Sequence, residues 1–170
     1  MPERIQSLRE FWPYYLSEHS NPRSRALHFV GTTGFMASCV ASAVTSPIAF
    51  PAAVAGMLAI GKKGVELEKK QRPFKHVLGM LALPTLASPV LFPAGVVFAY
   101  GCAWAGHFGF EKNRPATFQY PLMSLASDFK MWSHMARGKL WSGDPLVELG
   151  FVPEPGGPHV EGQPAVAAAE

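Results

Sequence analysis

Three histidines stand in two short polar segments that border long apolar stretches of the chain. His19 and His28 are nine residues apart near the N-terminus, and His107 follows about eighty residues later. Imidazole is the commonest side-chain ligand of metals, and iron, zinc and copper all accept it. Carboxylates and arginines accompany the histidines in both segments. The pattern predicts a metal site at a membrane border, where it would act on a lipid.

The spacing within each segment fits a metal site and also a simpler alternative. His107 and Glu111 are four residues apart, which places both side chains on one helical face, where the carboxylate could ligate a metal or hold the imidazole tautomer. The alternative is a solvated polar pair at the end of an interfacial helix. An Asn-Pro pair between His19 and His28 predicts a turn that brings one ring near the other. Each of these two rings alone is also typical of a structural hydrogen bond.

Two arginines near the histidines are candidate substrate ligands. Arg25 and Arg114 could each bind a fatty acid carboxylate through two parallel hydrogen bonds, although an arginine at a membrane border also commonly meets a lipid phosphate. Asp128 is a further carboxylate whose part in the metal site the sequence leaves open. We assign no role in the site to the remaining histidines, which are His76, His134 and His159.

The distribution of apolar residues indicates a membrane protein built from helices. Hydrophobic residues make up 48% of the chain and charged residues only 16%, and residues 34–61 and 77–106 contain no charged side chain. Each of these stretches exceeds the roughly 20 apolar residues that cross a bilayer as a helix. A core helix of a water-soluble protein would need a polar face, which these stretches lack. We therefore expect an all-α, integral, multi-pass membrane protein.

The number of membrane crossings depends on the prolines inside the two apolar stretches. Proline removes a backbone donor and clashes with the preceding turn. Each stretch is therefore either one long kinked span or a helical hairpin with its tip at the prolines. These prolines are Pro47 and Pro51 in the first stretch and Pro84, Pro89 and Pro93 in the second.

Basic residues favour two helical hairpins, which gives four short membrane helices. The basic residues gather in residues 4–25, 62–75 and 112–139. Because Lys and Arg that flank membrane helices stay on the cytoplasmic side, the three segments should share that side, and only two hairpins allow this. Both termini would then be cytoplasmic. Any even number of crossings also leaves His28 and His107 on the same face of the membrane.

Amphipathic helices are expected on both flanks of the membrane helices. Apolar residues recur at helical spacing over residues 5–16 and again over residues 122–136. We expect both segments to lie at the membrane interface, a level that also suits the four tryptophans of the chain. Residues 1–150 should form a single membrane domain. Residues 151–170, rich in Pro, Gly and Ala, should form a disordered tail.

The remaining composition argues against several classes of protein. Cys39 and Cys102 both fall in apolar stretches and provide neither a disulfide framework nor a zinc-binding spacing. A sequence pI near 9.0 is explained by juxtamembrane lysines and arginines, so nucleic acid is not an expected partner. Residues 1–30 hold no apolar core of a cleavable signal peptide, so we expect the first apolar segment to remain as an anchor. A transporter is disfavoured because no charge interrupts either apolar stretch.

The histidines stand within two longer motifs. The first covers residues 15–32 and contains Tyr15, His19, Pro22, Arg25, His28 and Gly31. The second covers residues 106–116 and reads Gly-His-Phe-Gly-Phe-Glu-Lys-Asn-Arg-Pro-Ala. Together with residues 120–129, these motifs resemble the 2-hydroxy fatty acid dioxygenase family (Mpo-like, long catalogued as a domain of unknown function), in its bacterial-type branch. The resemblance covers residues 11–140.

This resemblance implies a small multi-pass membrane enzyme that uses iron(II) and dioxygen to shorten 2-hydroxy fatty acids by one carbon, in fatty acid α-oxidation. The motif histidines of the family fall on His19, His28 and His107, which would be the metal ligands and catalytic residues. Arg25 and Arg114 would meet the substrate. The membrane would be a bacterial inner membrane or the endoplasmic reticulum of a eukaryote. The sequence does not decide whether the protein forms a homo-oligomer. The alternative is a non-enzymatic membrane protein whose polar cluster binds lipid headgroups or a partner helix.

Overall fold

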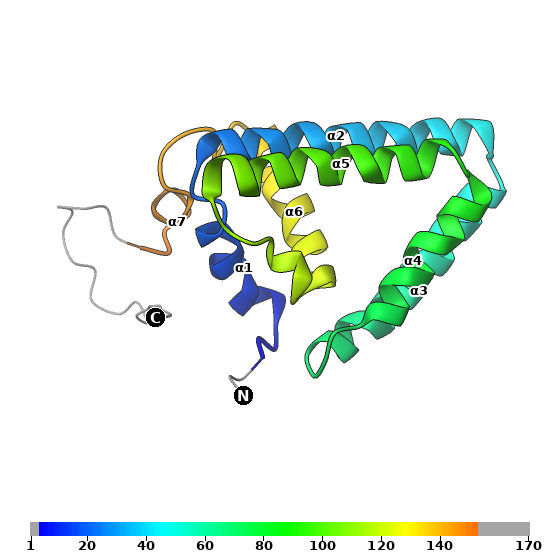
Figure 1. The fold of residues 1–170 in the computed structure, drawn as a ribbon, viewed down its shortest axis with the longest axis horizontal. Helices are drawn as coiled ribbons and strands as arrows, with labels where there is room; N and C mark the ends of the chain where they lie inside the picture. The colour runs from blue at the N-terminus through cyan, green and yellow to red at the C-terminus, as the bar shows by residue number, and fades with distance from the viewer. Residues whose placement is uncertain (1–3, 153–170) are drawn as a thin grey trace.

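The computed structural model describes residues 4–152, and every regular element within them is a helix, which confirms the all-α prediction. Four long helices form two antiparallel pairs (Figure 1). The elements are α1 (Leu8–Ser17), α2 (Pro22–Thr45), α3 (Ala49–Glu68), α4 (Phe74–Ala87), α5 (Leu91–Gly106), the π-helical turn η1 (His107–Glu111), the 3-10 turn η2 (Ala116–Phe118), α6 (Pro121–Ala136) and α7 (Pro145–Glu148). The predicted tail, residues 151–170, lies almost wholly outside the described residues.

The prolines break both apolar stretches where the sequence predicts. Helix α2 ends just before Pro47, and α4 ends just before Pro89. The helices joined by these turns diverge and do not pack as closed hairpins, so α2 lies along α5, and α3 lies along α4, as the two arms of a V (Figure 1). The sequence predicted a hairpin within each apolar stretch, which would pair α2 with α3 and α4 with α5. The structure corrects this pairing, because the closest packing is available between α2 and α5.

Small residues allow α2 and α5 to approach closely. A Cβ atom on Gly31 would lie only 2.9 Å from a side-chain carbon of α5, and a Cβ atom on Gly95 would lie 2.6 Å from Cβ of Ser38. Any side chain at these two glycines would therefore force the helices apart. Near the point of the V, the buried hydroxyl of Ser88 donates a hydrogen bond of 2.9 Å to Oγ of Ser42, which joins the two arms.

Two helices are long and apolar enough to cross a membrane, Pro22–Thr45 and Leu91–Glu111. Only 22% of the most apolar window of each is buried inside the protein, so their outer faces present apolar side chains. The most exposed of these side chains are Val40, Val44 and Val97. Helix α4 is also apolar but shorter. The structure therefore provides two candidate spans, and the arrangement with four spans stays a prediction.

Helices α1 and α6 pack against each other and form a core. Phe11 and Leu16 of α1 are fully buried together with Met131 of α6 and Leu140 beyond it, and Trp12 is only 3% exposed. A stripe of apolar residues is stabilised equally by lipid or by a neighbouring helix. Helices α1 and α6 therefore bury apolar side chains against each other, and their placement at the membrane interface stays a prediction.

One buried carboxylate fastens the α3–α4 arm to α6. Glu68 ends α3, is fully buried, and accepts hydrogen bonds from the backbone N–H groups of Leu122 and Met123, each at 2.8 Å. These N–H groups belong to the first turn of α6, where no helical carbonyl is available to them. A negative charge at a helix N-terminus is also favourable. Glu68 therefore sets where α6 begins relative to the α3–α4 arm.

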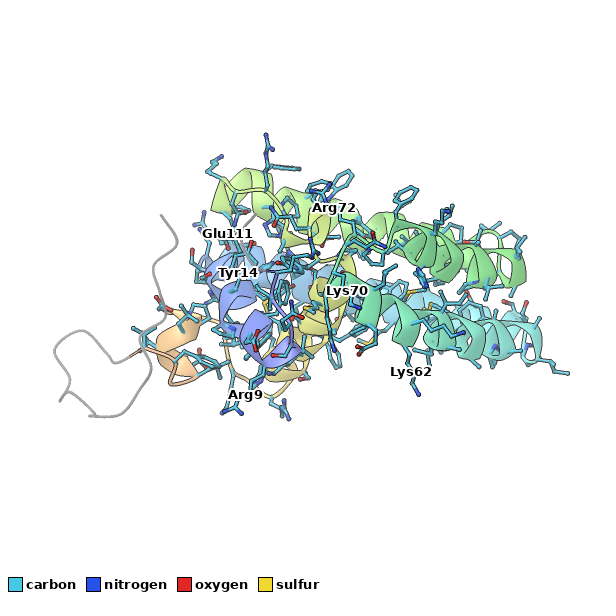
Figure 2. The ribbon with its side chains drawn as sticks, turned by 90° about the horizontal axis from the view of Figure 1, so that it is seen from below. Arg9, Tyr14, Lys62, Lys70, Arg72 and Glu111 are labelled. Carbon is cyan, nitrogen blue, oxygen red and sulfur yellow. The ribbon has the colours of Figure 1, made fainter. Side chains whose placement is uncertain are left out.

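The three basic segments lie on the same side of the molecule. Figure 2 shows Lys70 and Arg72 of the loop between α3 and α4 near Tyr14 of α1. Arg72 and Tyr14 line a common surface pocket with Arg114 of the third segment, and Arg4 donates to the Glu68 carbonyl at 2.9 Å. The structure therefore brings residues of all three basic segments together, and the side of the membrane that they face stays a prediction.

Replacing Gly95 with alanine should loosen the α2–α5 contact. The new methyl group would meet Cβ of Ser38, which cannot rotate away, so Gly95→Ala should lower the free energy of unfolding by about 1–3 kcal/mol. Gly101→Ala is the matched control, because a Cβ atom on this glycine of the same helix meets nothing within 4 Å. The fraction of protein that stays monodisperse after heating in detergent measures the difference. Equal heat resistance of both variants would contradict the packing described above.

Candidate functional site

Three buried histidines converge where α1, α2 and α5 meet. His19, His28 and His107 are 1%, 7% and 2% exposed. Their ring centroids are 4.5 Å (His19–His28), 4.7 Å (His19–His107) and 5.3 Å (His28–His107) apart. One ligand nitrogen from each ring lies within 4.8 Å of the others. Among residues 4–152 this is the one group of histidine, cysteine or carboxylate side chains placed to hold a metal.

Each histidine reaches the centre from the end of a helix. His19 lies in the turn between α1 and α2, His28 lies in the second turn of α2, and His107 opens the π-helical turn after α5. The side chain of Asn21 accepts a backbone N–H at 2.9 Å and caps α2, while Pro22 starts the helix with a suitable φ angle. Because α2 and α5 are antiparallel, the start of α2 meets the end of α5, which brings the three rings together.

Every ring of the cluster uses its Nδ1 atom for a hydrogen bond to an oxygen. The bonds join His19 to the carbonyl of Tyr15 (2.6 Å), His28 to Asp128 (2.6 Å) and His107 to the side-chain carbonyl of Asn113 (2.7 Å). These oxygens accept, so each Nδ1 carries a hydrogen and donates it. In the neutral ring, Nε2 is then left with a free lone pair, which is the state that binds a metal.

The cluster fits a metal ion in its bonding and its charge. The Nε2 atoms of His19 and His28 are buried and have no hydrogen-bond partner. A buried polar atom without a partner costs about 1–3 kcal/mol, so two in one cluster call for a ligand. Burial, together with the neighbouring His28 and His107, holds the pKa of His19 well below its usual range. His19 is therefore neutral at pH 7, as a metal ligand must be.

Asp128 of α6 connects the cluster to its surroundings. Its carboxylate accepts hydrogen bonds from Nδ1 of His28, from the hydroxyl of Tyr15 at 3.1 Å and from the hydroxyl of Thr32. Burial, and then the charge of Asp128, raise the pKa of Tyr15 well above its usual range, so the phenol stays protonated and donates. Asp128 therefore lies behind His28 and orients it. Sequence reasoning assigned no role to Tyr15, Thr32 and Asn113, although all three stand inside the two motifs.

Arg25 has a structural role, which corrects its assignment as a substrate ligand. The side chain is fully buried. Its guanidinium donates hydrogen bonds to the backbone carbonyls of His19, Ser20, Leu140, Ser142 and Gly143. An arginine has five N–H donors, so none is left for a fatty acid carboxylate. Arg25 instead fixes the turn that carries His19.

Glu111 likewise lies outside the cluster. Its carboxylate accepts hydrogen bonds from the Ser20 hydroxyl at 3.0 Å and from the Asn21 N–H at 2.9 Å, so it ties the end of η1 to the start of α2. Glu111 and His107 both belong to the π-helical turn η1, but the Glu111 carboxylate is used for these two bonds and is not part of the three-histidine group. Arg114 is exposed, and its role as a substrate ligand stays a prediction.

Two adjoining cavities open beside the cluster. The smaller, of about 90 Å³, is lined by polar groups that include Tyr15, His28 and Asp128. The larger, of about 170 Å³, lies between the two arms of the V and is lined mainly by apolar side chains. Six residues line both cavities, namely Thr32, Ala99, Tyr100, Pro121, Leu125 and Asp128. The two spaces therefore join at Asp128.

These features define a class of protein: an all-helical chain with a buried three-histidine candidate metal site at one end of two helices long enough to cross a membrane. Residues 5–140 match the family described as 2-hydroxy-palmitic acid dioxygenase Mpo1-like. The match covers most of the chain, so the protein belongs to this family, and the resemblance seen in the motifs is confirmed. No curated protein and no solved structure matches the chain.

Replacing Asp128 with asparagine should weaken metal binding without removing a ligand. Loss of the carboxylate that orients a ligating histidine typically lowers metal affinity by about 10–100-fold. We expect Asp128→Asn to show this loss in a titration of the metal-free protein with iron(II) under anaerobic conditions. Glu66→Gln is the control, because Glu66 is exposed on α3 and pairs with Lys69. An unchanged affinity in Asp128→Asn would contradict the role given to the His28–Asp128 bond.

Proposed function

We propose that this protein is an iron(II)-dependent dioxygenase that shortens 2-hydroxy fatty acids by one carbon. The observation that carries the proposal is the buried cluster of His19, His28 and His107, with Nδ1 of each ring engaged and two Nε2 atoms without partners. The name of the family supports the reaction and the class of substrate. Three imidazole ligands leave positions free on an iron ion, which non-haem oxygenases need for dioxygen and substrate.

The proposed reaction needs no reductant besides the substrate. When a 2-hydroxy acid is converted to the one-carbon-shorter acid and carbon dioxide, it loses four electrons. Dioxygen accepts four electrons, so one molecule of the 2-hydroxy acid and one of dioxygen balance to the shorter acid, carbon dioxide and water. Iron would supply the redox chemistry that allows dioxygen to react with an organic acid.

The residues of the chain bind and orient the reactants. The smaller cavity meets His28 and Asp128 and would receive the polar end of the substrate. Asp128, held by the hydroxyls of Tyr15 and Thr32, keeps the His28 ring in one orientation. The exposed guanidinium of Arg114 would attract the substrate carboxylate to this side of the molecule.

We also propose that the protein is a multi-pass membrane protein with its basic side in the cytoplasm. The mostly exposed apolar faces of α2 and α5 support this placement, because water-soluble proteins rarely leave such long apolar surfaces uncovered. The metal centre would then lie at the cytoplasmic border of the bilayer, where a fatty acid can enter with its chain still among apolar groups.

Replacing a histidine of the cluster should abolish turnover. His19→Ala, His28→Ala and His107→Ala should each lose bound iron and the formation of the one-carbon-shorter acid, measured by mass spectrometry. His76→Ala is the control, because His76 lies on α4, outside the cluster. Turnover retained by all three variants would show that the site is elsewhere. A wild-type protein that binds no iron when purified anaerobically would favour the non-enzymatic alternative.

Topology tags test the membrane placement separately. Reporter tags at the N-terminus, within residues 62–75 and after Leu140 should all report the cytoplasmic side, because the charges and the fold place these segments together. A tag within residues 62–75 that reports the opposite side would rule out the arrangement with four spans.

A further inference from the structure

The α3–α4 arm contributes no residue to the histidine cluster, yet it forms one wall of the larger cavity. Met57 of α3 and Val77, Met80 and Leu81 of α4 line this wall. The opposite wall comes from α2 and α5, and α6 closes the cavity on a third side. None of the four side chains on the α3–α4 wall can donate or accept a conventional hydrogen bond. This wall is therefore suited to hydrocarbon.

The polarity of the two joined cavities changes along their length. Thr32, Tyr100 and Asp128 lie where the cavities meet, and the larger cavity continues between apolar side chains such as Phe92 and Val96. A molecule that fills both spaces must therefore have a polar end at His28 and Asp128 and an apolar remainder. Because the larger cavity shares six lining residues with the smaller one, it is the apolar space next to the head-group site, into which an acyl chain would extend from a head in the smaller cavity.

The distance between the polar end and the apolar wall is fixed by the fold. Glu68, at the end of α3, accepts the N–H groups of Leu122 and Met123 in the first turn of α6, and α6 carries Asp128. The arm that supplies the wall is thus bonded directly to the helix that holds the head-group site. A chain bound with its head at Asp128 meets the wall after a defined length.

We propose that the α3–α4 arm selects the length of the acyl chain. The inference rests on the proposed function for the identity of the head group. It adds that a wall limits the length of the acyl chain, and this wall is formed by Met57, Val77, Met80 and Leu81. Each methylene that enters the cavity should strengthen binding about fourfold. Methylenes beyond the wall should add nothing or weaken binding.

The test measures binding, so that it does not depend on turnover. A series of saturated 2-hydroxy fatty acids of increasing length competes with a fluorescent fatty acid for the full-length protein, supplied with iron(II) under anaerobic conditions in mild detergent so that no turnover occurs. Affinity for the wild type should rise about fourfold per methylene up to a limiting length. Val77→Phe should move this limit to shorter chains because the added ring fills the cavity. Met57→Ala should move it to longer chains because it removes part of the wall.

Leu78→Phe is the matched control for Val77→Phe. Leu78 is the next residue on α4, is 59% exposed and does not line the cavity, so its replacement should leave the limit unchanged. Met57→Ala only removes atoms and so keeps the test decisive if Val77→Phe does not fold. The same limiting length in the wild type, Val77→Phe and Met57→Ala would overturn the proposal, as would the absence of saturable binding.

Turnover distinguishes this inference from the proposed function. If the wild type shows the length limit and the variants shift it, but no one-carbon-shorter acid forms, then the length selection stands and the dioxygenase proposal fails. If the shorter acid forms with the same chain-length profile in the wild type and both cavity variants, then the dioxygenase proposal stands and the role of the α3–α4 wall is refuted.

Discussion

The site depends on the close antiparallel contact between α2 and α5. Gly31 and Gly95 leave so little room that a Cβ atom on either would lie within 3 Å of the facing helix. Helix axes usually lie about 8–10 Å apart, with the spacing set by the side chains in the contact. With hydrogen as the side chain at these positions, the start of α2 can come near the end of α5. That approach is what allows His107 to meet His19 and His28, which lie about eighty residues earlier in the sequence.

The histidine cluster is held by groups that lie around it and are not part of the three-histidine group. Arg25 uses all its donors on backbone carbonyls and so fixes the turn of His19. Asp128 and Asn113 accept from the outer nitrogens of the other two rings. The Nε2 atoms of the rings take no part in these bonds, and those of His19 and His28 are buried without hydrogen-bond partners. Local rules of stability are commonly broken at functional sites, and here a metal would supply the missing bonds.

The two arms of the V contribute different parts of the site. The α2–α5 arm carries two of the three histidines, whereas the α3–α4 arm supplies an apolar wall across the larger cavity. Helix α6 lies against both arms and carries Asp128, and Glu68 holds its first turn. A lipid that enters between the arms would therefore meet hydrocarbon-like surroundings along its length and polar groups at one end.

The sequence by itself determined the features that depend on residue type and on near neighbours. The apolar stretches predicted helices, the prolines at 47 and 89 marked the turns, and the three motif histidines were selected as candidate ligands. The tertiary structure alone decided which helices pair, which apolar residues of α1 and α6 pack together, and that Arg25 and Glu111 are engaged by hydrogen bonds to segments distant in the chain. The physical reason is that a side chain has the same chemistry whatever partner it meets. An apolar stripe is satisfied by lipid or protein, and a guanidinium binds a substrate carboxylate or five backbone carbonyls. Only the packing of segments distant in the chain selects between them.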